Sequence, residues 1–213
     1  SIAYFMIFQN PNVDLAWYEP RWKSGKEQIE QIHPFSSYID NPYVIAYEMT
    51  NAMNNYSTVG NLSATYEFSP KLDLLVRSGI TTRQEDRSQR RPFNTANFPF
   101  GYYKEQNIFD YEINTDFLIT FKEKIGSDID IRTSFGGNTR REKYRLTNGV
   151  LDGLVIPGVY KLSNGISNPM MTTSHANKRV NSLYGLATFS YQDKVFVDVT
   201  GRNDWSSTLP VQN

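Results

Sequence analysis

Residue types that often carry catalysis or bind metals are sparse in this chain of 213 residues, which has two histidines and no cysteine. His33 and His175 are far apart, and neither has a carboxylate at a spacing suited to a shared metal ion. Asp128 and Asp130 could bind a hard cation, but strand alternation would place both on one polar face. Phosphate-binding Gly-Lys loops and a Ser/His/acid set are also missing. We therefore expect no catalytic residue, no metal, no cofactor and no enzyme activity.

A group of aromatic residues near the N-terminus suits binding better than catalysis. Trp17, Tyr18 and Trp22 are close in sequence, and flat rings exposed on a loop can stack on sugars or bury into a partner protein. The same rings could instead form the internal core of a large loop. Both interpretations stay open, and Trp17, Tyr18 and Trp22 are candidate contacts for a substrate or partner.

Charge and composition exclude several classes of protein. The 22 basic and 22 acidic residues balance, so there is no electrostatic reason to expect nucleic acid as a partner. The densest charge run, RQEDRSQRR at 83–91, could contact an anionic ligand or lipopolysaccharide, but a solvated loop is the simpler interpretation. No apolar run reaches the 18 residues that a transmembrane helix needs.

Alternation of apolar and polar residues runs through most of the chain. In GNLSATYEF (60–68), for example, Leu62, Ala64, Tyr66 and Phe68 alternate with polar side chains, which is the pattern of a strand with one buried face. No period of 3.6 extends beyond a few turns. We therefore expect an all-β fold of about seven antiparallel strands. The stretch NPYVIAYEMT (41–50) is expected to be extended structure within or beside a loop, or the start of a long bent strand.

The connections between these strands alternate in length, which favours a membrane barrel over a soluble sandwich, since outer-membrane barrels have short periplasmic turns and long outer loops. The expected long segments are Asn10 to Tyr56, Gln84 to Ile108 and Glu142 to Val180, and the short turns are Ser69 to Lys71, Lys122 to Ser127 and Gln192 to Lys194.

The last strand illustrates the expected membrane crossing. In VDVTGRNDWSSTLP (197–210), Val197, Val199 and Trp205 share one face, and Asp198 and Arg202 share the other. About ten residues at a rise of roughly 3.3 Å, tilted near 45°, climb about 23 Å, close to the height of the apolar band. Trp205 would then lie at the membrane interface, where aromatic residues form a girdle.

The same parity divides the strand residues into two sets. The residues expected to face the lumen of the barrel are Asn61, Ser63, Thr65, Glu67, Asp116, Asp130, Arg132, Asp198 and Arg202. Those expected to face lipid are Leu62, Tyr66, Val76, Phe117, Ile131, Phe189 and Val197.

GRNDWSSTLP (201–210) closely resembles a signature of the SusC/RagA-like TonB-dependent outer-membrane transporters of the Bacteroidetes. Further segments with this resemblance occur in the family's usual order along essentially the whole chain: PNVDL (11–15), YIDNPY (38–43), GNLSATYEFSPKLDLLVRSG (60–79), IPGVYKLSN (156–164) and KRVNSLYGLATFSYQDKVFVDVT (178–200).

The resemblance implies that residues 1–213 are part of a 22-stranded barrel domain, multi-pass in the outer membrane of a Gram-negative bacterium and surrounded by its lipid. Family members import glycans or oligopeptides under a SusD-like surface lipoprotein with energy relayed by TonB. The plug and the energy-coupling segment that carries the TonB contact are expected N-terminal to this chain, outside it. The alternative is a soluble β-sandwich carbohydrate-binding module.

Overall fold

A computed structural model describes residues 2–35 and 38–209. Its residues fall into two compact units, each described by itself below. The first, termed the loop unit, comprises Ser1–Asn55, Glu85–Ile108 and Leu146–Ser174; the second, termed the strand unit, comprises Tyr56–Gln84, Phe109–Arg145 and His175–Asn213.

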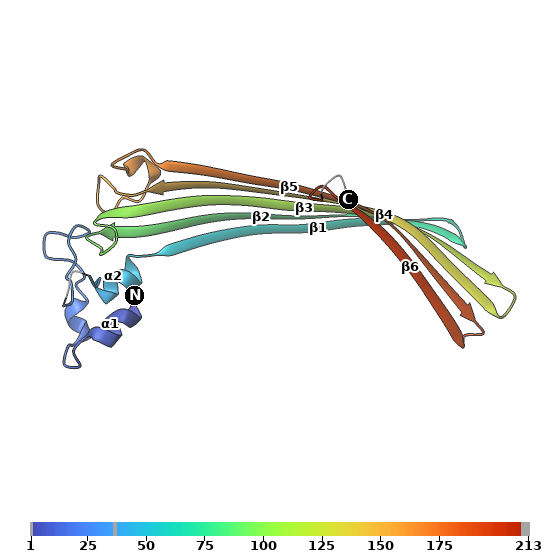
Figure 1. Cartoon of the computed structure of the whole chain (residues 1–213), viewed down its shortest axis with the longest axis horizontal. Coiled ribbons are helices and arrows are strands. Elements are labelled where there is room, and N and C mark those ends of the chain that lie inside the picture. Colours follow the sequence, from blue (N-terminus) through green and yellow to red (C-terminus); the bar gives the residue numbers. More distant parts are fainter. Residues whose placement is uncertain (1, 36–37, 210–213) are drawn as a thin grey trace. The chain divides into compact units, whose positions relative to one another are not determined.

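Strands dominate the described residues, and the predicted all-β fold class is confirmed. In chain order the elements are α1 (Ile2–Phe8), the 3₁₀ helix η1 (Leu15–Tyr18), α2 (Pro42–Tyr47), β1 (Asn51–Ser69), β2 (Leu72–Phe93), β3 (Phe100–Ile125), β4 (Ile129–Leu151), the 3₁₀ helix η2 (Leu162–Asn164), β5 (Met170–Tyr191) and β6 (Val195–Ser206). The six strands form one antiparallel sheet in the order β1-β2-β3-β4-β5-β6 (Figure 1). The expectation was about seven strands, and the part of the chain described here contains six.

A single sheet argues against the alternative sandwich. Sandwich folds bury a core between two facing sheets, whereas every named strand within residues 2–35 and 38–209 belongs to the same sheet. Across those same residues, no helix is long and apolar enough to cross a lipid bilayer.

Two of the short turns lie where the sequence predicts them, whereas the turn expected at Lys122 to Ser127 begins only at residue 126, because β3 continues to Ile125. Pro70 and Lys71 join β1 to β2, residues 126–128 join β3 to β4, and residues 192–194 join β5 to β6. In the last turn Gln192 and Asp193 have φ values of 50° and 53°, a left-handed conformation that tight hairpins require. The register that follows pairs Tyr191 with Val195 and Phe189 with Val197.

The long connections are shorter than expected, because the strands continue into them. Gln84 to Ile108 is reduced to residues 94–99, and Glu142 to Val180 is reduced to residues 152–169. A membrane strand needs only about 9–11 residues, while β3 has 26. In the charged run at 83–91, for example, β2 continues through residues that are polar on both faces, so the alternation is lost although the hydrogen-bonded ladder persists.

Residues 41–50 were expected to be extended, and this is wrong for their first part, which forms α2. The side chain of Asn41 accepts a hydrogen bond from the backbone N–H of Tyr43 at 2.9 Å, and Pro42 occupies the first helical turn. Both features favour a helix start. The apolar run is too short for its period to separate helix from strand.

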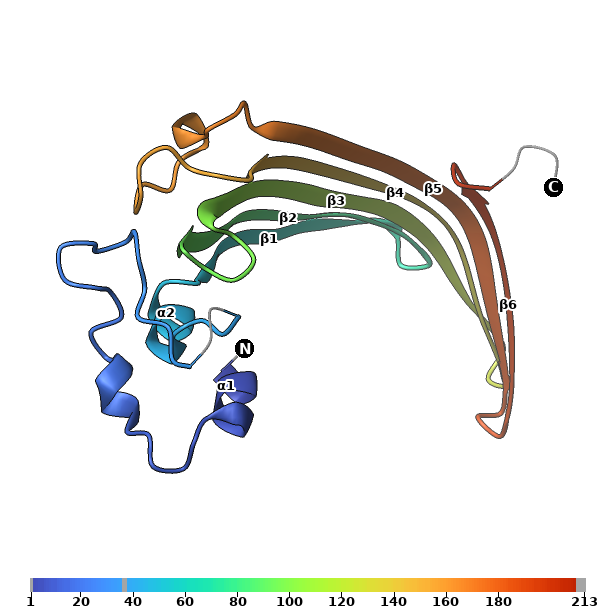
Figure 2. The same ribbon diagram turned by 60° about the vertical axis from the view of Figure 1, so that its left-hand side comes forward.

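The loop unit has a small core of its own. Phe5 of α1, Tyr18 of η1 and Ile39 are buried together, and the rings of Phe5 and Tyr18 meet edge to face at 5.7 Å. Helices α1 and α2 contact one another (Figure 2). Burying a side chain such as that of Phe5 contributes about 1.5–3 kcal/mol, so these contacts hold the short helices that would not form alone.

A buried set of polar groups, termed the polar knot, joins the N-terminal segment to the connection between β2 and β3. Gln31 and Asn41 are fully buried. Gln31 receives the backbone N–H of Asn41 at 2.7 Å and donates to Asp40 at 2.9 Å, and its own backbone N–H donates to Asn94 Oδ1 at 3.0 Å. Asn41 also donates to the carbonyl oxygens of Tyr18 and Ile32, both at 3.0 Å. The buried amide groups of Gln31 and Asn41 therefore have hydrogen-bond partners, as buried polar groups in folded proteins usually do.

Candidate functional site

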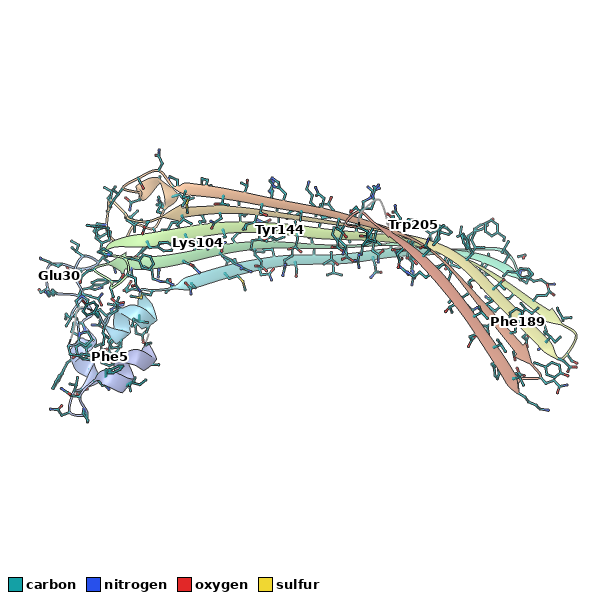
Figure 3. The ribbon with its side chains drawn as sticks, viewed as in Figure 1. Phe5, Glu30, Lys104, Tyr144, Phe189 and Trp205 are labelled. Carbon is teal, nitrogen blue, oxygen red and sulfur yellow. The ribbon has the colours of Figure 1, made fainter. Side chains whose placement is uncertain are left out.

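The sheet of the strand unit has two chemically different faces. On one, Phe189 lies opposite Val197, Ala187 opposite Val199 and Asn181 opposite Trp205; this is termed the apolar face. On the other, the register pairs Thr188 with Asp198, Tyr184 with Arg202 and Ser182 with Asp204; this is termed the polar face. Side chains project from both faces of the ribbon, with Phe189 and Trp205 labelled in Figure 3.

A hollow of about 870 Å³ lies on the polar face and is lined by residues from all six strands. Its charged lining is mostly paired. Arg77 donates to both oxygens of Asp116, the shorter contact being 2.6 Å. Arg202 donates to Asp204 at 2.8 Å and to Ser182 Oγ at 2.9 Å. Each exposed pair contributes at most about 1 kcal/mol to stability, so their main effect is a hydrated surface with both signs of charge.

Gly136 positions an aromatic ring in this hollow, and the sequence analysis missed it. A Cβ at Gly136 would lie 2.5 Å from the ring of Tyr184 and 2.7 Å from the backbone oxygen of Phe117. Only glycine leaves room for that ring, over which the guanidinium of Arg202 lies at 5.6 Å. A glycine inside an alternating strand was the available signal, since it often marks a close approach.

A second hollow, of about 540 Å³, lies nearer the short turns. Lys122 of its lining binds Asp73 at 2.9 Å, and Lys124 lies 3.6 Å from Asp130. On the neighbouring strands Thr188 Oγ1 donates to Asp198 at 2.6 Å. The polar face is therefore charged along much of its length.

The residues predicted to face a lumen share the polar face. Asn61, Ser63, Asp116 and Arg202 line the first hollow, and Asp130 and Arg132 line the second. Asp198 pairs with Thr188, and Thr65 and Glu67 follow Ser63 at every second position of β1. That this face meets a lumen stays a prediction.

The residues predicted to face lipid share the apolar face. Val76, Phe117 and Trp205 line one shallow depression, and Phe189 lies opposite Val197. Alternation places the side chains of Leu62, Tyr66 and Ile131 on the same face, although Leu62 also borders the first hollow and Ile131 the second. Many of these side chains are exposed, including Leu62 at 76% and Trp205 at 52%. An apolar surface of this extent marks a site of contact with lipid or protein.

The three aromatic residues predicted to contact a partner or substrate have different surroundings in the loop unit. Tyr18 and Trp22 are buried, at 9% and 8% exposure, whereas Trp17 is 62% exposed. Tyr18 and Trp22 thus act as loop core, and Trp17 alone is accessible. Sequence reasoning missed other exposed apolar residues nearby, Met6 and Ile7 of α1, although the apolar run at the start of the chain was a signal.

Tyr160, in the connection between β4 and β5, has an unusual environment. Burial, and next the negative charge of Glu48, raise its pKa to about 12. The guanidinium of Arg90 lies over its ring at 5.4 Å, and the ring of Tyr103 is 6.2 Å away. The phenol therefore stays neutral at pH 10, where an exposed tyrosine is half ionised.

The histidine predicted to lie apart from any metal site, His33, has hydrogen-bond partners of its own. No group of three or more His, Asp or Glu side chains within residues 2–35 and 38–209 could hold a metal ion. His33 Nε2 instead lies 3.1 Å from Asn94 Oδ1 and Nδ1 lies 3.1 Å from the carbonyl oxygen of Ile39.

A meandering antiparallel sheet with one charged face, one exposed apolar face and two- to three-residue turns defines a segment of a β-barrel wall. No family model matches the chain, and no curated protein matches it.

Solved structures do match. The RagAB peptide transporter is 18% identical with a TM-score of 0.71, over 82% of this chain and 20% of that chain. The RagAB peptide importer in the closed-closed state is 18% identical with a TM-score of 0.70, over 82% of this chain and 20% of that chain. In the open-open state it is 16% identical with a TM-score of 0.69, over 90% of this chain and 21% of that chain. The chain thus spans about a fifth of the length of these chains and has the fold of part of a RagAB transporter chain, which confirms the predicted resemblance at the level of the fold.

Proposed function

We propose that this chain is part of the barrel wall of an outer-membrane importer for oligopeptides or glycans, coupled to TonB and working with a SusD-like surface lipoprotein. The observation that carries the proposal is the exposed apolar face of the sheet opposite a charged face, because a wall between lipid and an aqueous lumen needs this asymmetry. The similar solved structures are of a peptide importer, so oligopeptides are the first substrates to test.

The charged face is compatible with such cargo. Its ion pairs, such as those of Arg77 and Arg202, leave both signs of charge facing the hollow, and zwitterionic peptides can form weak contacts with either sign. Exposed ion pairs bind weakly, which suits passage rather than retention. In this proposal the chain acts without enzymatic chemistry and without a cofactor.

The surface for the lipoprotein would come from the loop unit. Trp17, Met6 and Ile7 are large, apolar and exposed, and aromatic and methionine side chains are enriched where proteins meet. We assign the lipoprotein contact to this N-terminal surface rather than to Tyr18 or Trp22, whose burial keeps them from a partner.

Membrane placement can be tested by fluorescence quenching. In a full-length protein whose other tryptophans are replaced by phenylalanine, brominated lipids should quench Trp205, and in the matched protein that keeps only Trp17 they should not. Equal quenching of both, or none, would contradict the wall assignment.

Transport can be tested with the full-length protein in cells. Labelled oligopeptide should enter in a manner that requires both this protein and TonB, and the surface lipoprotein should co-purify with it. Uptake of labelled oligosaccharide in place of peptide would correct the substrate, and uptake that is unchanged without TonB would refute the mechanism.

A further inference from the structure

A row of basic residues lies on the apolar face of β4. Thr139 and Gly137 border the depression on that face together with Trp205, and alternation then places the next odd-numbered residues of β4 there too. These are Arg141, Lys143 and Arg145, all of which are exposed. The intervening Arg140 and Glu142 belong to the polar face, where they pair at 2.9 Å.

A fourth cation joins this row from β5. Thr139 Oγ1 donates to Asn181 Oδ1 at 2.9 Å, and a Cβ on Gly137 would lie 3.1 Å from Leu183. These contacts fix the register of the two antiparallel strands, so one step of two residues beyond Thr139 brings Arg141 opposite Arg179. Side chains in such pairs start about 4.5–5.5 Å apart at Cβ. Arg141, Lys143, Arg145 and Arg179 are termed the basic patch.

The basic patch concentrates positive charge, although Lys143 also borders a hollow that is lined by Asp110, Glu112 and Glu142. Across residues 2–35 and 38–209, no carboxylate forms an ion pair with any of its four side chains, whereas Arg77, Arg140 and Arg202 of the polar face each have an acidic partner. Like charges directly opposite each other on a sheet destabilise it. An anion between Arg141 and Arg179 would remove that repulsion.

The position of the patch next to apolar surface favours a lipid as the source of such an anion. Trp205 pairs with Asn181, and the next residue of β5 on this face, Arg179, pairs through its backbone N–H with Ser207 Oγ at 3.0 Å. The patch therefore begins about 7 Å along the strands beyond Trp205. The rings of Phe109 and Tyr111 on β3 lie 6.2 Å apart, and alternation puts them on the same face. Apolar and aromatic surface thus gives way to cations at the end of the strands away from the short turns.

We propose that the basic patch binds the phosphate groups of a phosphorylated glycolipid in the outer leaflet. The inference rests on the proposed function, since it requires this face to lie in an outer membrane. Arginine suits the role because its guanidinium makes paired hydrogen bonds to phosphate oxygens. The acyl chains would lie along the apolar depression next to Trp205, and the phosphates would lie between Arg141 and Arg179.

The test uses the full-length protein in lipid nanodiscs and native mass spectrometry, with bisphosphorylated lipid A as the probe. The Arg141→Gln/Arg179→Gln variant should retain about ten-fold less lipid A than the unmodified protein, since hydrogen bonds to charged groups are the stronger ones. The matched control is Arg132→Gln/Lys178→Gln, which removes the same charge from the polar face and should retain lipid A fully. Lipid A without phosphates should bind weakly to all three proteins.

Several results would overturn the inference. If the two double variants retained lipid A equally, or if lipid A without phosphates were retained equally well, the patch would not bind the phosphate groups. Release of lipid A by excess inorganic phosphate alone would assign the site to a free anion. If the Arg141→Gln/Arg179→Gln variant retained lipid A but no longer self-associated, this face would be a contact between copies of the protein. Barrel assembly is followed by heat-dependent gel migration; if the unmodified protein forms no membrane barrel, the proposed function fails as well, whereas an assembled barrel without lipid A rejects only the basic patch.

Discussion

Val199 lies on the apolar face of β6, opposite Ala187 of β5, and is 58% exposed. If Trp205 marks the membrane interface, Val199 is six residues below it along the strand. At a rise of about 3.3 Å and a tilt near 45°, this corresponds to a depth of about 14 Å. The apolar band of an outer-membrane barrel is about 25 Å tall, so Val199 lies close to its midplane.

Replacing Val199 by arginine should therefore have nearly the full cost of a cation at the midplane, about 2–4 kcal/mol. Val197 lies about 19 Å below Trp205 and closer to the opposite edge of the band, so Val197→Arg should cost about 1–2 kcal/mol. Thr200 is on the polar face between Asp198 and Arg202. Thr200→Arg should change stability by less than about 0.5 kcal/mol, as surface substitutions usually do.

The assay compares the three variants in the full-length barrel reconstituted in lipid, by the denaturant midpoint of the heat-dependent gel shift. The expected order of destabilisation is Val199→Arg, then Val197→Arg, then Thr200→Arg. A larger effect at Thr200 than at Val199 would mean that the polar face meets lipid. Equal effects at all three positions would mean that neither face does, and the depth calculation would be refuted.

Four further substitutions test the described contacts. Gly136→Ala should destabilise the barrel by about 1–3 kcal/mol, because the added methyl group meets the ring of Tyr184 and a backbone oxygen; an unchanged denaturant midpoint would show that the ring moves freely aside. Trp22→Ala should destabilise the loop unit by about 3–5 kcal/mol and make it sensitive to protease. Trp17→Ala should leave protease resistance intact and weaken co-purification of the lipoprotein. The reverse pattern would make Trp17 the core residue and Trp22 the contact residue. Tyr160, with its pKa raised to about 12 from 10.0, stabilises the folded protein below pH 10, and this contribution should be lost as pH rises towards 12. When tyrosine ionisation is followed by absorbance, the Tyr160→Phe variant should lack one tyrosine that titrates near pH 12. If it lacked one that titrates near pH 10 instead, the burial of Tyr160 would be rejected.

The faces of the strands and the short turns could be predicted from sequence because both depend on neighbouring residues alone. Side chains alternate along any strand, so Asp198 and Arg202 had to share a face, and the turn at residues 192–194 needs only local chemistry. Strand length was not predictable in the same way. In RQEDRSQRR the strand β2 continues with polar residues on both sides, so the pattern that identifies strands is absent while the backbone pairing remains.

The aromatic residues of the N-terminal segment show a second limit. Trp17, Tyr18 and Trp22 are similar in type and close in sequence, yet only Trp17 is exposed. Burial of Tyr18 depends on Phe5 and Ile39, which are more than ten residues away on either side. Such partners cannot be inferred from spacing, because the chain between them follows no regular period. The helix α2 could have been predicted, since Asn41 and Pro42 are residues that favour the start of a helix.

The polar knot limits how this protein could be recombined with other proteins of the same fold. The buried amide of Gln31 is completed by Asn94, 63 positions later in the chain, so the N-terminal segment and the β2–β3 connection form one unit of exchange. A protein that received residues 10–50 of this chain, but had no acceptor at the position of Asn94, would bury the backbone N–H of residue 31 without a partner, at a cost of about 1–3 kcal/mol. Grafting both segments together avoids that cost. Binding specificity housed in this region would therefore pass between proteins as a pair of segments, or not at all.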